Sequence, residues 1–173
     1  QKIIEEGRTE AIVGAIKPFF HSSDLRIIQW ETPLATHGKR MRKAGPRLGC
    51  APICAELATA LETDVALLAN NHIGDQGPDA TLSTLDEFAR RGIRTAGAGA
   101  DETLAGTPLH LTIKERKVVI INVAEHEFGI ATPSCPGAAG IRPLKNISQI
   151  SEARKNADIV IMTIHGGHEL NPY

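Results

Sequence analysis

The spacing of hydrophobic residues along the chain alternates between helical and extended patterns. Apolar residues at helical spacing predict four helices, over residues 8–20, 52–62, 78–91 and 148–157. Short apolar or alternating runs predict six strands, over residues 25–30, 64–69, 93–96, 107–113, 117–124 and 158–164. Because strands and helices alternate through most of the chain, the expected fold is α/β, a layered sandwich with a mostly parallel sheet.

Turn-forming residues support these boundaries. Pro52 and Pro78 stand where two of the helices begin. Residues 114–116 separate two strands at hairpin distance, so the sheet is expected to be mixed. Residues 31–51 and 125–147 are rich in glycine and proline and are expected to be loops. A loop as long as 31–51 in a compact domain is usually functional or mobile.

Three of the predicted strands end in polar side chains, at residues 29–33, 70–77 and 165–169. Ligands of open α/β sheets bind beyond the carboxyl ends of the strands, so these clusters converge if the strands are parallel neighbours. Their carboxylate, amide and imidazole groups suit Mn, Fe, Zn or Mg. Two such ions can hold the attacking and leaving oxygens of a phosphoryl transfer, and a histidine at the rim can protonate the leaving group.

Each cluster also has a purely structural interpretation. Asn70-Asn71 is a common turn element, because asparagine tolerates left-handed backbone. Taken alone, His72 is equally consistent with a surface histidine, and Glu31 with a solvated loop. His165 stands in a more informative segment, because buried strands seldom end in two histidines and a glutamate. The prediction of a site therefore depends on the three clusters together.

Composition and charge indicate which kinds of binding partner are expected. Net charge is −1 and aromatic residues make up 3% of the chain, so no nucleic-acid partner is expected. The basic segment 39–43 is either a solvated surface or a means of gathering an anionic substrate. No stretch is long enough to cross a bilayer, so membrane attachment is expected only through segments outside this chain.

Three further patterns are weaker candidates for sites. The cysteines, Cys50, Cys54 and Cys135, are more consistent with small buried side chains than with a zinc site. Gly97-Ala98-Gly99 resembles a dinucleotide loop only weakly, because Glu102 replaces the third glycine. His126, between two glutamates after a strand, is the best additional candidate for a site residue.

The strand-end motifs together resemble the CapA family of poly-γ-glutamate capsule biosynthesis proteins, within the calcineurin-like metallophosphatase superfamily. Residues 29–33 are similar to the family's Asn-Leu-Glu-Thr-Pro segment, and 70–77 match its Asn-Asn-His-x-x-Asp-x-Gly turn. Gly97-Ala98-Gly99, with Glu102 and Ala105 downstream, and the final His-Gly-Gly-His-Glu follow the same pattern. The resemblance runs from about residue 20 to the end.

The resemblance implies roles for individual residues. Asn71, His165 and Glu31 are expected to bind metal, and His72 is expected to contact the substrate or leaving group. Glu31 and Glu169 are expected to be the acids of the site. The complete domain is expected to hold two divalent ions.

The chain also departs from the family pattern. Gln29 replaces the usual asparagine and Gly166 the usual tryptophan. The opening Gly-Asp strand and the later Gly-His-x-His segment, which supply metal ligands in the superfamily, are absent. Residues 1–173 are therefore expected to form a single partial metallophosphatase-like domain, incomplete at both ends, that holds only part of the site and binds metal weakly or not at all by itself.

The leading hypothesis is a metal-dependent hydrolase of phosphoesterase type, acting in capsule or cell-envelope poly-γ-glutamate metabolism on an anionic polymer or phosphoester. The alternative is a non-catalytic accessory or binding subunit of a polymer-synthesis machinery, and a γ-glutamyl amide hydrolase or ligase lies between the two. The resemblance also suggests the cell envelope or extracellular face, although no signal or anchor is visible in the sequence.

Overall fold

The computed structural model describes residues 1–35 and 38–167, and contains two main sheets. The first is parallel, with the order β1 (Ile27–Gln29), β2 (Val65–Leu67) and β3 (Arg94–Ala96). In the second, β6 (Arg116–Ala124) lies between β5 (Leu109–Ile113), which is antiparallel to it, and β8 (Ile159–His165), which is parallel. A small antiparallel pair joins β4 (Ala98–Gly99) to β7 (Gly137–Ala138).

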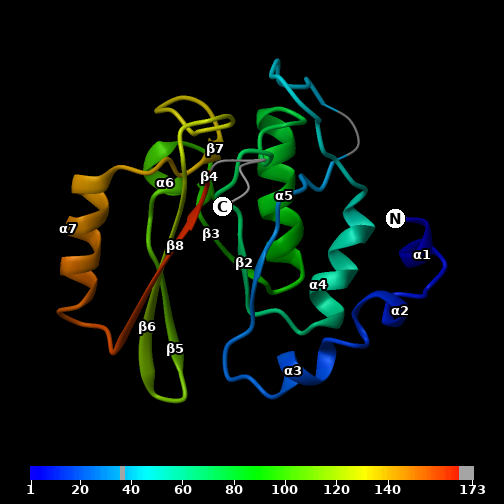
Figure 1. Cartoon of the computed structure of the whole chain (residues 1–173), viewed down its shortest axis with the longest axis horizontal. Coiled ribbons are helices and arrows are strands. Elements are labelled where there is room, and N and C mark those ends of the chain that lie inside the picture. Colours follow the sequence, from blue (N-terminus) through cyan, green and yellow to red (C-terminus); the bar gives the residue numbers. More distant parts are fainter. Residues whose placement is uncertain (36–37, 168–173) are drawn as a thin grey trace.

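The two main sheets pack face to face, with helices on both outer sides (Figure 1). Their shared core joins Val65, Leu67 and Ala96 of the first sheet to Val118 and Ile120 of the second. The other face of the first sheet is covered by η1 (Pro52–Ala55), α4 (Glu56–Ala60) and α5 (Pro78–Arg90), and that of the second by α7 (Pro143–Ala153). The α/β layered class is confirmed, with the strands divided between two sheets.

The first predicted helix is wrong in its extent. In place of one helix over 8–20, the structure has two short ones, α2 (Glu10–Val13) and α3 (Lys17–His21), and a further short helix, α1 (Lys2–Glu5), precedes them. Gly14 follows α2, and Pro18 lies in the first turn of α3. Glycine is a weak helix former, and proline is tolerated only in a first turn, so a single continuous helix is disfavoured here.

The last predicted helix starts earlier than expected. α7 begins at Pro143 and ends at Ala153, where the pattern predicted 148–157. The Asn146 side chain accepts a hydrogen bond from the Arg142 backbone N–H at 2.7 Å, which stabilises this start. The short helix α6 (Glu102–Ala105) was not predicted. Its N-cap is Asp101, whose side chain accepts bonds from two backbone N–H groups of the first turn.

The parallel strands of both main sheets send their carboxyl ends to the same side of the sandwich. β1 and β2 are parallel in one sheet, and β6 and β8 are parallel in the other, with Ala124 opposite His165. The polar segments that follow these strands therefore meet at one edge. In the part of the chain that the structure describes, no helix has the length and apolar character of a membrane span.

Candidate active site

Three of the predicted site residues lie together at this edge. Nε2 of His165 is 3.3 Å from Oδ1 of Asn71, and Nδ1 of His165 is 3.7 Å from Oε1 of Glu31. Glu31 follows β1, Asn71 follows β2 and His165 ends β8, so the cluster is built across both sheets. The His165 side chain is 24% exposed and that of Glu31 44% exposed, which leaves the cluster accessible to a ligand.

A buried asparagine connects the two sheets beneath this cluster. Oδ1 of Asn122, on β6, accepts a hydrogen bond from the Ala69 N–H at 2.8 Å, and its Nδ2 donates to Thr163 of β8 at 2.9 Å. Gly97 permits this approach, because a Cβ there would lie 2.0 Å from Asn122 Oδ1. The first glycine of the weak dinucleotide-loop pattern therefore makes room for the contact between the sheets.

Glu127 contacts the cluster, and the sequence pattern did not identify it. Its Oε2 accepts a hydrogen bond from Nδ2 of Asn71 at 2.6 Å. The pattern favoured the neighbouring His126, but Nε2 of His126 lies 2.9 Å from the Ile141 carbonyl oxygen instead. The only sequence signal for Glu127 was that its segment follows a predicted strand, as the other polar segments do. The direction of each side chain depends on the turn after β6, which the sequence pattern does not predict.

The two adjacent asparagines of the turn have different contacts. Asn70 is fully buried, and its Nδ2 donates to the backbone oxygens of Trp30 and Leu68, each at 3.0 Å. Its Oδ1 accepts from the N–H groups of His72 and Ile73 at 2.9 and 2.8 Å. Asn70 therefore shapes the turn, while Asn71 presents its amide to the cluster. The interpretation of Asn70-Asn71 as a structural turn element therefore holds for Asn70 but not for Asn71.

His72 lies in a buried charged group beside the cluster. Its Nδ1 is 2.7 Å from Oδ2 of Asp75 and 3.1 Å from the Lys43 ammonium. That ammonium lies 2.5 Å from Asp75 Oδ1 and donates to the Asn71 carbonyl oxygen at 3.0 Å. Asp75 Oδ1 forms an ion pair with Lys43, but the geometry of this contact is not that of a regular hydrogen bond. The side chains of Lys43 and Asp75 are 2% and 0% exposed, so solvent screens this pair little.

An ionised carboxylate can only accept hydrogen bonds. The His72 tautomer consistent with the contact to Asp75 therefore carries a proton on Nδ1 and donates it to the Asp75 carboxylate. The Lys43 protons are then directed to Asp75 Oδ1 and to the Asn71 carbonyl. This leaves Nε2 of His72 as the ring atom that faces away from the ion pair. The His72 side chain is 14% exposed.

The basic loop, residues 38–49, is fastened over the turn. Asp75 accepts the Leu48 N–H on its carboxylate at 2.7 Å and the Met41 N–H on its backbone oxygen at 3.1 Å. Gln76 donates from Nε2 to the Leu48 carbonyl at 2.7 Å. Gly77 has a φ of +93°, and a Cβ there would lie 2.5 Å from the Lys39 carbonyl oxygen. The sequence interpretations of this loop did not anticipate the buried Lys43.

The cluster supplies donor atoms that can be compared with the needs of a divalent ion. Among residues 1–35 and 38–167, no group of three or more His, Cys, Asp or Glu side chains is arranged to hold a metal. Glu31 and His165 form a pair, and the amide oxygen of Asn71 adds a third donor of the kind that Mn or Mg accepts. Asn71 faces Nε2 of His165 and Glu31 faces Nδ1, so the His165 ring or one of the two oxygen side chains must turn before all three donors reach one ion. The described residues offer no comparable set for a second ion.

Two expectations from the sequence fall elsewhere. Glu169 and the neighbouring His168 lie outside the described residues. All three cysteines are free, and burial, together with the nearby Cys54, raises the pKa of Cys50 to about 12. Cys54 is buried and Cys50 is partly buried, which agrees with their interpretation as small side chains in or near the core.

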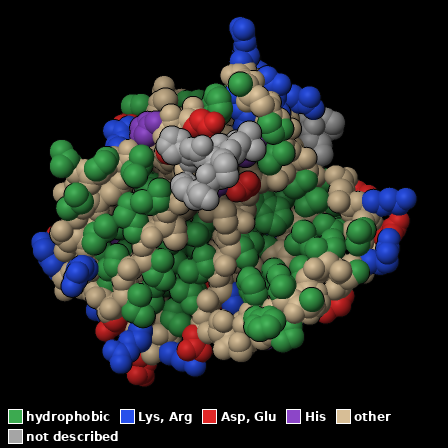
Figure 2. Space-filling model, viewed as in Figure 1, with side chains coloured by type: hydrophobic (Ala, Val, Ile, Leu, Met, Phe, Trp, Pro, Cys, Tyr) green, Lys and Arg blue, Asp and Glu red, His purple; other side chains and the backbone are tan. Residues whose placement is uncertain are grey.

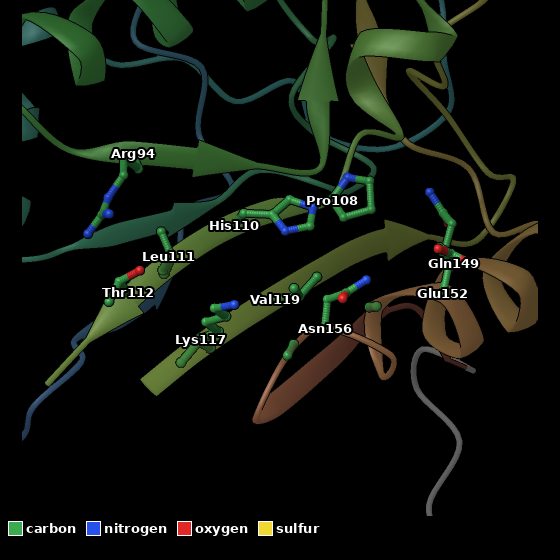
Figure 3. A pocket seen from close by; sticks show the side chains of 13 residues that line it. Arg94, Pro108, His110, Leu111, Thr112, Lys117, Val119, Gln149, Glu152 and Asn156 are labelled. Carbon is green, nitrogen blue, oxygen red and sulfur yellow. The ribbon is translucent and has the colours of Figure 1, made fainter. Parts of the chain in front are cut away.

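A separate pocket of about 560 Å³ lies between the β5–β6 hairpin and α7 (Figure 3). Arg94, His110 and Lys117 contribute polar groups to its lining, and Val119 contributes apolar surface. It shares no lining residue with the cluster of Glu31, Asn71 and His165, so the two features are distinct.

The fold and the cluster define a class, an α/β sandwich with a polar site where parallel strands end. The whole chain, residues 1–173, matches the family described as bacterial capsule synthesis protein PGA_cap, and it belongs to this family. The expected membership is thereby confirmed.

Individual relatives agree with this membership. The chain is 28% identical to the PGA biosynthesis protein CapA of Bacillus subtilis, over 98% of this chain and 46% of that protein. It is 30% identical to a Mycobacterium tuberculosis protein named "Probable polyglutamine synthesis accessory protein", over 84% of this chain and 42% of that protein. The chain thus spans less than half the length of these relatives. A 5′-nucleotidase precursor from Thermus thermophilus aligns with a TM-score of 0.47 and 16% identity, over 65% of this chain and 23% of that one.

Proposed function

We propose that this chain supplies part of the active site of a metal-dependent hydrolase of phosphoesterase type that acts in capsule or cell-envelope polyglutamate metabolism. The observation that supports the proposal is the meeting of Glu31, Asn71 and His165 beside the His72–Asp75 pair. The family membership and the names of the relatives supply the polymer context. The rest of the site belongs to the remaining length of such proteins.

In this proposal Glu31, Asn71 and His165 hold a divalent cation, Mn, Fe, Zn or Mg. When bound, the cation supplies charge to polarise the substrate oxygen. A second ion would need donors beyond the described residues.

His72 is the residue proposed to move a proton. Asp75 accepts the Nδ1–H bond and orients the ring. In the imidazolium form, Nε2–H would give its proton to the leaving oxygen, and the neutral ring with its Nδ1–H bond to Asp75 would remain. Lys43 pairs with Asp75 and donates to the Asn71 carbonyl. These two contacts fix the position of the turn at residues 70–77, and of the His72 ring, relative to the cluster. A positioned proton donor of this kind contributes roughly 10²–10⁴-fold to a rate.

The test is an assay of the purified full-length protein on a generic phosphodiester and a phosphomonoester with Mn. The His72→Ala protein is expected to lose turnover by roughly 100-fold or more while retaining metal. The His165→Ala protein is expected to lose both turnover and bound metal. His110→Ala, an exposed histidine on β5, is the control and should match the wild type. Equal turnover and metal content in all four proteins would refute the proposal.

A second candidate function is a non-catalytic accessory subunit that binds the polymer. It is favoured by the name of the Mycobacterium tuberculosis relative. It is also favoured by the described residues, among which no group of three or more His, Cys, Asp or Glu side chains is arranged to hold a metal. Polymer binding by a full-length protein that shows no turnover with any of the four metals would support this function over the first.

A further inference from the structure

The loop over the site bears a local concentration of positive charge. Lys39, Arg40 and Arg42 are exposed, although the chain as a whole has a net charge of −1. Among the described residues, none of the three forms an ion pair within 4.0 Å. Lys and Arg side chains gather at the upper end of the molecule in Figure 2, where Figure 1 places this loop. These charges are therefore available to a ligand.

The backbone of the same loop is restrained by hydrogen bonds and by the Lys43 side chain. Nε of Arg47 donates to the Met41 carbonyl at 2.7 Å, and its Nη2 donates to the Lys43 carbonyl at 3.1 Å. The Lys43 side chain points inward to Asp75 and also lies over the Phe128 ring, 5.4 Å from its centroid. Because the loop backbone is already ordered, a ligand that binds the exposed cations loses less conformational entropy than it would on a free loop.

The loop also adjoins the candidate site directly. The Lys43 ammonium is 3.0 Å from the Asn71 carbonyl oxygen and 3.1 Å from His72 Nδ1. Arg42 is the preceding residue and is exposed. A chain bound along residues 39–42 is thus brought to the rim of the cluster.

We propose that the exposed cations of this loop, Lys39, Arg40 and Arg42, form a docking site for a carboxylate polymer that is led to the active-site edge. The inference rests on the proposed function for the identity of that edge. Repeated carboxylates match a row of fixed cations. Residues 38–49 contain no aromatic side chain, so the loop offers no stacking platform for nucleic-acid bases.

The test measures binding of labelled polyglutamate to the full-length protein by fluorescence anisotropy at low salt. The triple variant Lys39→Ala/Arg40→Ala/Arg42→Ala is expected to bind roughly tenfold more weakly, since each exposed ionic contact contributes a modest amount. Wild-type affinity should fall as salt is added. Uncharged polyglutamine, which has nearly the same shape, should not bind.

The control removes the same number of charges elsewhere. Arg94→Ala/Lys117→Ala/Lys145→Ala changes two cations of the separate pocket and one on α7 (Figure 3). This protein should bind polyglutamate like the wild type. The docking proposal is overturned if the control loses as much affinity as the loop variant, if polyglutamine binds equally well, or if polyphosphate is bound more tightly than polyglutamate.

Docking and catalysis can fail separately in this design. Binding is measured without turnover, in buffer that contains no added metal. If the loop variant loses binding while the wild type hydrolyses nothing, the docking site stands and the hydrolase proposal fails. If the wild type hydrolyses phosphoesters while the loop variant keeps full polymer affinity, docking at this loop is refuted.

Discussion

At the scale of single residues, the contacts of Asp64 predict how stability depends on pH. Burial alone would raise the pKa of Asp64, but hydrogen bonds from the Arg26 side chain and backbone hold it below the ordinary value of 3.8. A depressed folded-state pKa stabilises the fold above the unfolded pKa, and this contribution is lost as pH falls through the folded value. Asp64→Asn should therefore lower the free energy of unfolding at pH 7, with a difference from wild type that shrinks below about pH 4.

The measurement is urea denaturation of both proteins at several pH values. Asp79→Asn, an exposed carboxylate in the first turn of α5, is the control and should show a smaller effect at pH 7. A stability difference for Asp64→Asn that stays constant down to about pH 2 would contradict the assigned cause.

Gly97 gives a second prediction at this scale. Its φ is +87°, and an added Cβ would lie 2.0 Å from Asn122 Oδ1 and 2.7 Å from the Ala69 Cβ. Gly97→Ala should therefore destabilise the fold by about 3 kcal/mol or more, from backbone strain and overpacking together. Gly92→Ala has a similar φ of +71° with no atom within 4 Å of the added Cβ, so it should cost only about 1–2 kcal/mol. Thermal unfolding of both variants separates strain from crowding, and equal losses would show that the close approach to Asn122 is not needed.

The candidate site was only partly predictable from its residues. Glu31, Asn71 and His165 could be found because each follows or ends a strand with a strong hydrophobic signal. Lys43 and Glu127 lie in irregular loops. Their side-chain directions depend on tertiary contacts that have no sequence period, so the hydrophobic pattern could not select them.

At the scale of elements, the buried strands were predicted more successfully than the helices. β2 is a continuous apolar segment, and β6 is apolar from Val118 to Ala124 except for Asn122, so their burial follows largely from composition. The first helix was wrong because Gly14 and Pro18 outweigh the apolar spacing, and α7 was placed late because its start lies in a Gly- and Pro-rich segment. The assignment of strands to two sheets follows from packing across the core, which the local pattern does not specify.

The loop over residues 38–49 gives a prediction at the scale of an element. Lys43→Met leaves the buried Asp75 carboxylate without its cation, and removal of one partner of such a pair typically costs about 3–5 kcal/mol. The same change should free the loop, because Lys43 also binds the Asn71 carbonyl. Hydrogen exchange should become faster at the Met41 and Leu48 amides, which Asp75 holds in the native structure.

Arg42→Met is the matched control, since Arg42 is the exposed neighbour in the same loop. Its effect on the free energy of unfolding should stay within about 0.5 kcal/mol, and the two amides should keep their protection. Similar losses in both variants would mean that the Lys43–Asp75 pair does not fasten the loop.

At the scale of the whole molecule, the site exists only because two sheets are packed together. Glu31 and Asn71 come from the first sheet, and His165 from the second. Asn122 joins the sheets directly beneath them. Because the three side chains meet only where the sheets pack together, a ligand that binds all three must stabilise the packed state over the unfolded chain.

This coupling predicts a metal effect that does not depend on turnover. Mn added to the wild-type chain should raise the Tm, and at roughly 100 times the dissociation constant the stabilisation is about 2.7 kcal/mol. His165→Ala and Glu31→Ala should each reduce the Tm shift, because either change removes one of the three donors. His126→Ala should keep the full shift, since that ring contacts the Ile141 carbonyl instead of the cluster. A shift equal in all four proteins would place the metal elsewhere, while loss of the shift in the two cluster variants alone would locate the ion between the sheets.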